Sequence, residues 1–201
     1  AERLLAMLGA LHDAELTPIG RQMLRLPMHP RYSRMLIEAS QRGCVPDAAL
    51  CAALVSGRDL LARLDRDDAQ TQAAREMFEA SDDSDFITLM RAYDFAKSNR
   101  FSFERCRSHG INAQVARQVE QTCQQILHAA HQQRLYDRDA SPTKNDDALQ
   151  RCLMAGFVDQ FAKRRAPGKP ACDLTEQRQG QLVRESVVQD APFFVAVNLR
   201  E

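Results

Sequence analysis

Two pairs of side chains have the types and spacing of metal-binding or reactive groups. His128 and His131 stand three positions apart, so a helix would place both imidazoles on one face, where they could bind zinc. Cys106 and His109 could act as a nucleophile and its base. No third zinc ligand is evident near the histidines, and no third residue is in place to orient the cysteine–histidine pair. A solvated helix face and an ordinary turn therefore explain the two pairs better.

An acidic cluster at Asp82, Asp83 and Asp85 could hold a divalent cation, but carboxylates are also favoured at a helix N-terminus, where they complement the helix dipole. The sequence contains no G-x-x-x-x-G-K-[ST] loop, no G-x-G-x-x-G turn, no G-x-S-x-G elbow and no H-E-x-x-H helix. The usual motifs of phosphate-binding, dinucleotide-binding, serine-hydrolase and zinc-protease chemistry are thus missing. We predict that this chain is not a catalyst by itself.

Charge is segregated along the chain, although 27 Lys and Arg residues balance 27 Asp and Glu residues overall. The segment 21–42 is basic, with Glu38 as its one acid, and the segment 65–94 is acidic. A second basic cluster has no acid between its members, which are Lys163, Arg164, Arg165 and Lys169. Such a cluster beside Phe157 and Phe161 is compatible with a surface that follows a phosphodiester backbone. From composition alone, a solvated charged surface over core aromatics is the better explanation.

Apolar residues recur at helical spacing through the first 135 residues. Helices are predicted over Leu4–Leu11 and from starts at Thr17-Pro18, Pro30, Pro46-Asp47, Ser84 or Asp83, and Asn112. Gly43 is expected to end the third of these, and Gly57 to weaken the fourth before Leu60. Residues 65–85 are predicted to be an acidic connection. Short helices joined by short loops predict a helical bundle.

The pattern changes beyond residue 135. Residues 136–148 are polar and predict a linker, and a short helix is expected to end near Gly156. Strands are predicted over Phe157–Arg165, Gln181–Val188 and Phe193–Leu199. The fold class is therefore a mainly α helical bundle followed by a partial β domain, α+β overall. Because so few strands are marginal alone, we expect the β domain to be a truncated part of a larger fold.

Composition excludes several classes of protein. The scattered cysteines form no C-x-x-C pair and predict reduced, mostly buried thiols; they are Cys44, Cys51, Cys106, Cys123, Cys152 and Cys172. No stretch approaches the ~20 apolar residues of a membrane span, and no signal-peptide pattern opens the chain. We therefore predict a cytoplasmic protein with no membrane partner.

Three ordered stretches carry a family resemblance. Residues 16–31 read LTPIGRQMLRLPMHPR, and SRMLI follows at 33–37. Residues 84–93 read SDFITLMRAY, with FERCR at 103–107. Beyond the linker come AGF, FAKRR and SVV, at 155–157, 161–165 and 186–188. These stretches resemble the helicase-associated region of DEAH-box (DEAH/RHA) ATP-dependent RNA helicases, and the arginine-rich composition favours a bacterial member. Phe86 and Arg105 depart from the His and Trp that are frequent in the family.

The resemblance implies a domain order. Residues 1–29 would be the end of a winged-helix domain, and residues 30–135 the helical ratchet bundle. A linker over 136–148 would lead to a truncated OB-like domain over 149–201. The family's two RecA-like motor domains, with the P-loop and the DEAH box, would lie upstream. ATP and Mg are therefore expected for the full-length helicase and not for this fragment, and no residue here is assigned as catalytic.

The resemblance also implies roles for individual residues. Nucleic-acid contacts are expected at Arg31, Arg34, Lys163, Arg164, Arg165 and Lys169. Architectural roles are expected at Thr17, Pro18, Gly20, Pro27, Pro30, Ser84, Asp85, Gly156 and Phe157. The expected function is to guide single-stranded RNA, or DNA, past the motor domains of the same chain, with an activator peptide as a further partner at the OB-like domain. The alternative is a helical adaptor that binds protein and no nucleic acid.

Overall fold

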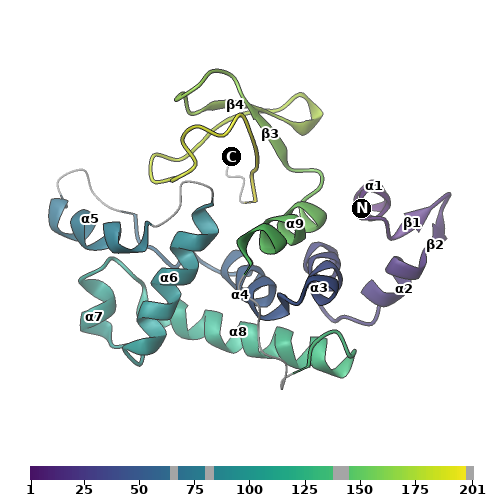
Figure 1. Ribbon diagram of the computed structural model, residues 1–201, viewed down its shortest axis with the longest axis horizontal. Helices are drawn as coiled ribbons and strands as arrows, with labels where there is room; N and C mark the ends of the chain where they lie inside the picture. The colour runs from purple at the N-terminus through teal and green to yellow at the C-terminus, as the bar shows by residue number, and fades with distance from the viewer. Residues whose placement is uncertain (64–67, 80–83, 138–144, 198–201) are drawn as a thin grey trace.

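The computed structural model describes residues 1–63, 68–79, 84–137 and 145–197, and it is mainly helical with a small antiparallel sheet near the C-terminus (Figure 1). The predicted fold class, a helical bundle followed by a partial β domain, is confirmed. Within these ranges no helix is long and apolar enough to cross a membrane. All six cysteines are buried and free, as the sequence predicts.

The N-terminal unit consists of α1 (Glu2–Met7), a small hairpin of β1 (Leu11–His12) and β2 (Glu15–Leu16), and α2 (Pro18–Met23). The first predicted helix is wrong at its end, because Leu11 lies in β1. The chain reverses at Asp13 and Ala14, which both have positive φ values of 49° and 65°. That conformation suits the tight turn of a two-residue hairpin loop.

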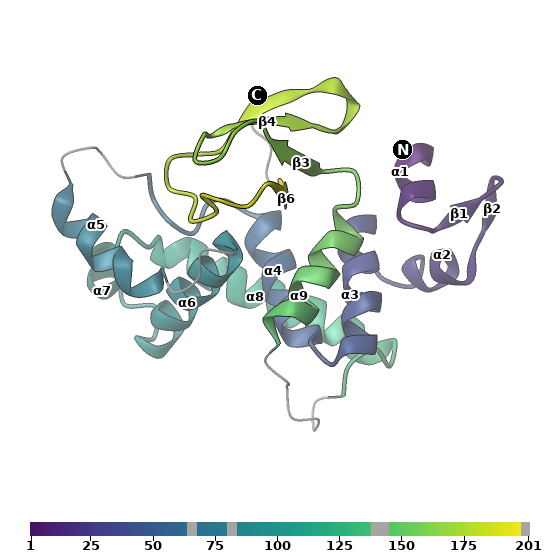
Figure 2. The same ribbon diagram turned by 45° about the horizontal axis from the view of Figure 1, so that its top comes forward.

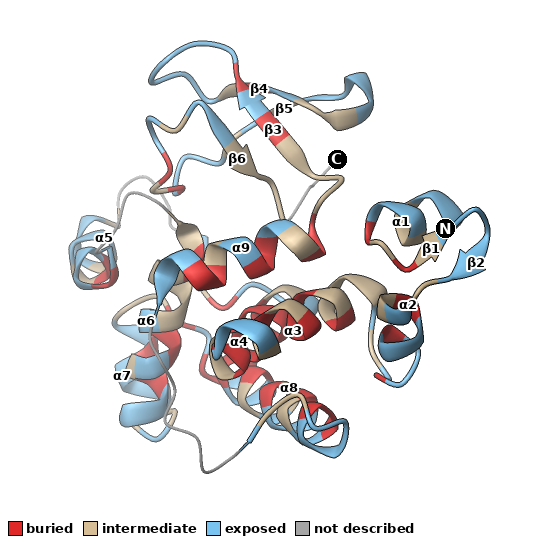
Figure 3. Ribbon diagram, turned by 45° about the vertical axis from the view of Figure 1, so that its right-hand side comes forward, coloured by how far each residue is buried: buried red, intermediate tan, exposed pale blue. Residues whose placement is uncertain are grey.

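A bundle forms the middle of the molecule. It contains α3 (Pro30–Arg42), α4 (Val45–Ser56), α6 (Asp85–Ser98), α8 (Ala113–Gln132) and α9 (Asp146–Gly156). Helix α4 is buried on nearly every side, packed against α3 and α8, and its many alanines let its neighbours approach closely (Figures 2 and 3). It ends at Ser56, so the predicted weakened continuation toward Leu60 is wrong, although Leu60 itself is buried.

The predicted helix boundaries are confirmed where a local signal sets them. Pro30 begins α3, and Gly43 ends it with a φ of +70°. The side chain of Asn112 accepts the backbone N–H groups of Gln114 and Val115 at 3.1 Å and so caps α8. Such caps satisfy amide groups that have no partner inside the helix.

The prediction of a connecting segment over residues 65–85 is wrong where those residues are described, because α5 (Ala69–Arg75) and the 3₁₀ helix η1 (Glu76–Phe78) lie there. Arg75 explains why this segment is ordered. Its guanidinium donates to the carbonyl oxygens of Ala62 at 2.6 Å, Gly110 at 2.7 Å and His109 at 3.3 Å. Phe78 is buried in the main core. A further short helix, α7 (Phe103–Arg107), precedes α8.

Helix α9 overlaps the end of the predicted linker and packs lengthwise on α3, so it adds to the bundle. The sheet that follows contains β3 (Phe161–Arg164), β4 (Ala171–Leu174), β5 (Gln179–Gln181) and β6 (Phe193–Val195), in the antiparallel order β5-β4-β3-β6. The 3₁₀ helix η2 (Thr175–Gln177) joins β4 to β5.

All three strand predictions need correction. The one over Gln181–Val188 is wrong except at Gln181, because Ser186 and Val187 bond to the bundle instead of to a neighbouring strand. The one over Phe157–Arg165 starts too early, since Phe157 caps the C-terminus of α9. The third predicted strand, Phe193–Leu199, ends too late, because β6 stops at Val195 and residues 196–197 are not in a strand; Leu199 falls outside the described residues.

Candidate nucleic-acid interface

Thr17, Pro18 and Gly20 join α2 to the N-terminal hairpin. The hydroxyl of Thr17 accepts the backbone N–H of Gly20 at 3.0 Å and donates to the carbonyl oxygen of Gly9 at 2.6 Å. Pro18 occupies the first position of α2. A Cβ on Gly20 would clash with the carbonyl oxygen of Ala10. These contacts hold the start of α2 against the N-terminal hairpin.

Arg31, at the start of α3, clamps the segment between α9 and β3. Its guanidinium forms a two-pronged ion pair with Asp159, in which Nη2 lies 2.6 Å from Oδ2, and it also lies over the ring of buried Phe157, 5.5 Å from the centroid. The hydrogen bonds from Arg31 hold the pKa of Asp159 below its ordinary value, outweighing the opposite effect of burial. A Cβ on Gly156 would lie only 2.8 Å from the backbone oxygen of Arg31, so glycine allows α9 to approach α3 there.

Arg34 also has an anionic partner. Its guanidinium donates to Glu38 one turn along α3 at 3.0 Å, and Arg42 donates to the same carboxylate from the other side at 2.6 Å. Burial alone would raise the pKa of Glu38, but the hydrogen bonds from Arg42 and Arg34 outweigh it and lower the pKa. Arg31 and Arg34 therefore neutralise acids of their own chain.

Asp85 joins the other end of the bundle to the C-terminal unit. Ser84 caps α6 by accepting the N–H of Phe86 at 3.3 Å, while the carboxylate of Asp85 accepts the hydroxyl of Ser186 at 2.9 Å and the N–H of Val187 at 2.8 Å. Ser186 is itself buried. The second motif and the last one, about a hundred residues apart, thus bind each other.

The basic cluster at the sheet divides into buried and exposed members. Arg164 is buried and donates to the carbonyl oxygens of Val188 and Lys169 at 2.6 Å and of Ala191 at 3.0 Å. Arg165 is exposed and pairs with Asp173 at 2.6 Å. Within the described ranges the ammonium groups of Lys163 and Lys169 have no hydrogen bond or ion pair with the protein, although Lys163 lies near an aromatic ring, 6.0 Å from the centroid of Phe193. These two lysines are the cluster's available cations.

Pro27 lies exposed in the turn after α2, and Pro30 begins α3.

The two pairs that could have been reactive or metal-binding, Cys106 with His109 and His128 with His131, do not form sites of that kind. Burial raises the pKa of the Cys106 thiol, and His109 Nδ1 instead lies 3.0 Å from the carbonyl oxygen of Arg105. His131 contacts the backbone of Tyr136.

Across the part of the chain that the structure describes, no group of three or more His, Cys, Asp or Glu residues could hold a metal ion. Asp82 and Asp83 lie outside that part. Asp85 is used by Ser186 and Val187.

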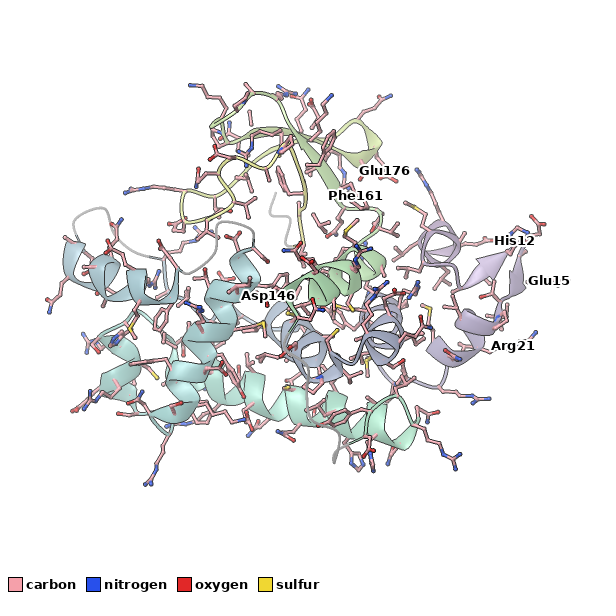
Figure 4. The ribbon with its side chains drawn as sticks, viewed as in Figure 1. His12, Glu15, Arg21, Asp146, Phe161 and Glu176 are labelled. Carbon is pink, nitrogen blue, oxygen red and sulfur yellow. The ribbon has the colours of Figure 1, made fainter. Side chains whose placement is uncertain are left out.

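The sequence did not identify Asp159 as the partner of Arg31, or Phe193 as an exposed ring on the sheet (Figure 4 shows Phe161 on the same sheet, above α9). No spacing pattern links Asp159 to Arg31, which is 128 residues away. Phe193 and Phe194 are adjacent in a predicted strand, so their side chains must point to opposite faces of the sheet. This pattern could have indicated that one of the two rings faces solvent.

Two family models match the first 89 residues. The family described as "Helicase associated domain (HA2), winged-helix" matches residues 1–28, and the one described as "Helicase associated domain (HA2), ratchet-like" matches residues 29–89.

Named relatives extend the similarity beyond residue 89. The chain is 32% identical over 162 residues to the pre-mRNA-splicing factor ATP-dependent RNA helicase prp22 of Schizosaccharomyces pombe, a match that covers 78% of this chain and 13% of prp22. It is 29% identical over 157 residues to the DExH-box ATP-dependent RNA helicase DExH3 of Arabidopsis thaliana, covering 75% of this chain and 13% of that protein. It is 32% identical over 124 residues to the ATP-dependent RNA helicase HrpA of Escherichia coli, covering 55% of this chain and 9% of HrpA.

The chain therefore spans only a small part of the length of these relatives. Together, the family matches and the relatives support its assignment to the C-terminal, helicase-associated region of a DEAH-box RNA helicase.

Proposed function

We propose that this helicase-associated region forms one wall of a path for single-stranded RNA beside the motor domains of a longer protein. The observation that carries the proposal is that the bundle holds two segments that flank the strands: Arg31 pairs with Asp159, just before β3, and Asp85 binds Ser186, between β5 and β6. Because both contacts tie these segments to helices, Lys163 is presented from a fixed support. A fixed support lets a cation meet a moving strand at a constant position.

The proposed phosphate contacts are Lys163 and Lys169, with Arg165 as a third cation that Asp173 partly neutralises. Lysines that neutralise phosphates release counterions and give affinity without reading the sequence. Arg164 is left out of these contacts because its donors are used by backbone carbonyls. Arg31 and Arg34 support the wall indirectly, through their ion pairs.

ATP hydrolysis belongs in this proposal to the motor domains. The relatives are named ATP-dependent RNA helicases, and the matched segment is a minor part of each. ATP and Mg would bind those motor domains, whose motion would draw the strand along the wall. We also propose that the sheet is part of an OB-like fold.

The proposal is tested by measuring the affinity of the chain for single-stranded RNA over a range of salt concentrations. Lys163→Ala/Lys169→Ala should make the slope of log affinity against log salt shallower by about 1.4, since each lost phosphate contact removes about 0.7 for single strands. The control is Arg58→Ala/Arg63→Ala, which removes two exposed charges just beyond the end of α4 and should leave the slope unchanged. Absence of RNA binding, or an unchanged slope in the lysine variant, would overturn the proposal.

A further inference from the structure

One face of the sheet is covered, and the other is exposed around Lys163 but half-buried at Phe161 and Val195, where Val195 packs against the bundle core. Residues that point to the covered face are Ala162, Arg164 and Cys172, which are all buried. Side chains alternate along a strand, so the residues between and beside them share the opposite face. We call this the outer sheet face, and its exposed members are Lys163, Arg165, Asp173, Gln179, Gln181 and Phe193.

Phe193 and Lys163 are direct neighbours on the outer sheet face. Their Cα atoms are partners in the antiparallel pairing of β6 with β3, and Lys163 is also the partner of Asp173 on β4. Phe193 leaves 65% of its surface exposed on β6, which lies at an edge of the sheet. Paired residues in an antiparallel sheet point to the same side, so the ring and the ammonium group lie together in water.

The charge of this face is concentrated at Lys163. Arg165 and Asp173 pair with each other at 2.6 Å and neutralise one another. Lys163 Nζ lies 6.0 Å from the centre of the Phe193 ring, at the outer limit of a cation–π contact, and therefore remains free to swing away. Among the described residues, this face thus offers the exposed ring of Phe193, the ammonium group of Lys163 without an ion-pair partner, and the neutral amides of Gln179 and Gln181.

We propose that Phe193 is a platform on which one base of single-stranded RNA stacks, while Lys163 binds a phosphate next to that base. This inference rests on the proposed function, and it adds that the contact requires an unpaired base. Every base has a π-face, so stacking of this kind is tolerant of sequence. A stacked base would displace the ammonium group of Lys163 from above the ring toward the adjoining phosphate.

Ring and cation together favour a nucleic acid over a protein partner. A protein that docked on Phe193 would have to cover Lys163 and the two glutamines, and a buried unpaired charge is costly. A nucleotide instead places an anion and a flat apolar surface a few ångströms apart, matching Lys163 and Phe193. The bases of a duplex are stacked on one another, so their faces are unavailable.

The test measures binding of a fluorescent single-stranded oligouridylate about 12 nucleotides long to the 201-residue chain. Phe193→Ala should lower the affinity about 5- to 100-fold. It should leave the salt dependence unchanged because no charge is removed. Phe193→Trp should keep at least the original affinity, because its larger ring also stacks. Phe103→Ala is the control: Phe103 on α7 is equally exposed, at 67%, and its loss should change nothing.

A matched oligonucleotide that lacks its bases separates stacking from phosphate binding. The chain and its Phe193→Ala variant should bind this abasic strand equally. The inference is overturned if Phe193→Ala binds oligouridylate as tightly as the unaltered chain, or loses the same factor on the abasic strand. If Lys163→Ala/Lys169→Ala changes the salt slope while Phe193→Ala has no effect, the stacking inference is wrong but the proposed function stands. If the unaltered chain binds no RNA, both the inference and the proposed function are wrong.

Discussion

At the scale of single residues, the ion pair between Arg31 and Asp159, which lies just before β3, should contribute more to stability than the ion pair of Arg165 with Asp173 on the sheet. Its side chains are only 14% and 23% exposed, whereas those of Arg165 and Asp173 are 42% and 53% exposed. We expect Asp159→Asn to lower the free energy of unfolding by about 1–3 kcal/mol, because a partly buried guanidinium loses its charged partner. Urea denaturation would measure the change.

Asp173→Asn is the control for that variant. It breaks an exposed ion pair in the same sheet and should cost less than about 1 kcal/mol, because water screens the pair. Equal losses in the two variants would show that Arg31 does not clamp the sheet to α3.

A second prediction at this scale concerns pH. His29 caps α3, where its Nδ1 accepts the N–H of Arg31, and burial together with the Arg31 charge lowers the pKa of His29 below 6.5. Just below that pH the unfolded chain binds more protons than the folded one, so stability falls as the pH decreases. His29→Asn keeps a cap acceptor and should make the unfolding midpoint less sensitive between about pH 7 and about pH 5. An identical pH profile in this variant would contradict the prediction.

Residue roles were predictable where the partner is local. Thr17 and Asn112 cap helices that start beside them, and that chemistry depends on a few neighbouring positions. Arg31 and Arg164 were predicted as phosphate contacts because a sequence shows charge but not what surrounds it. Their partners lie far along the chain or on backbone carbonyls, which no composition reveals.

At the scale of elements, Gly20 sets how closely α2 packs on the chain before it. Gly20→Ala should lower the free energy of unfolding by about 1–3 kcal/mol, because its new methyl group would clash with the backbone of Ala10. The matched control is Gly57→Ala, where a Cβ would meet only the carbonyl oxygen of Ala53 at 4.0 Å. Thermal unfolding of both variants would measure the two losses of stability. A loss of stability in Gly57→Ala as large as that in Gly20→Ala would contradict the packing argument.

Long elements with an apolar stripe were predictable, and short ones were not. Helix α8 carries buried residues at regular helical spacing over 20 residues, so its period is unmistakable. The strands β1 and β2 contain two residues each, too few to show a period. The segment at Ser186–Val188 has the composition of a strand, but Ser186 and Val187 bond to Asp85, and the carbonyl oxygen of Val188 accepts from Arg164.

At the scale of the whole molecule, Asp85 and Ser186 should act as one unit that holds the C-terminal segment to the bundle. We expect Asp85→Ala and Ser186→Ala to be non-additive, with a coupling energy of about 0.5–3 kcal/mol in a double-mutant cycle, because each removes the same contact. Urea denaturation of the four proteins would measure it. Additive losses would mean that the two residues stabilise their own elements separately.

The order of helices and sheet was predictable, but the joints between them were not. The three motifs were visible as separate stretches, and nothing in the sequence shows that Arg31 meets Asp159 or that Asp85 meets Ser186. Long-range polar contacts depend on the packed arrangement, which a single sequence does not display. Those two contacts join the helical bundle to the C-terminal segments.

The most direct test of the account is photocrosslinking of the chain to single-stranded RNA that carries a photoreactive uridine, with the linked peptides identified by mass spectrometry. We expect adducts on the outer sheet face, in β3 around Lys163 and in β6 at Phe193, and their loss on Phe193→Ala but not on Phe103→Ala. Adducts confined to the helices, or none above the level of a duplex control, would contradict it.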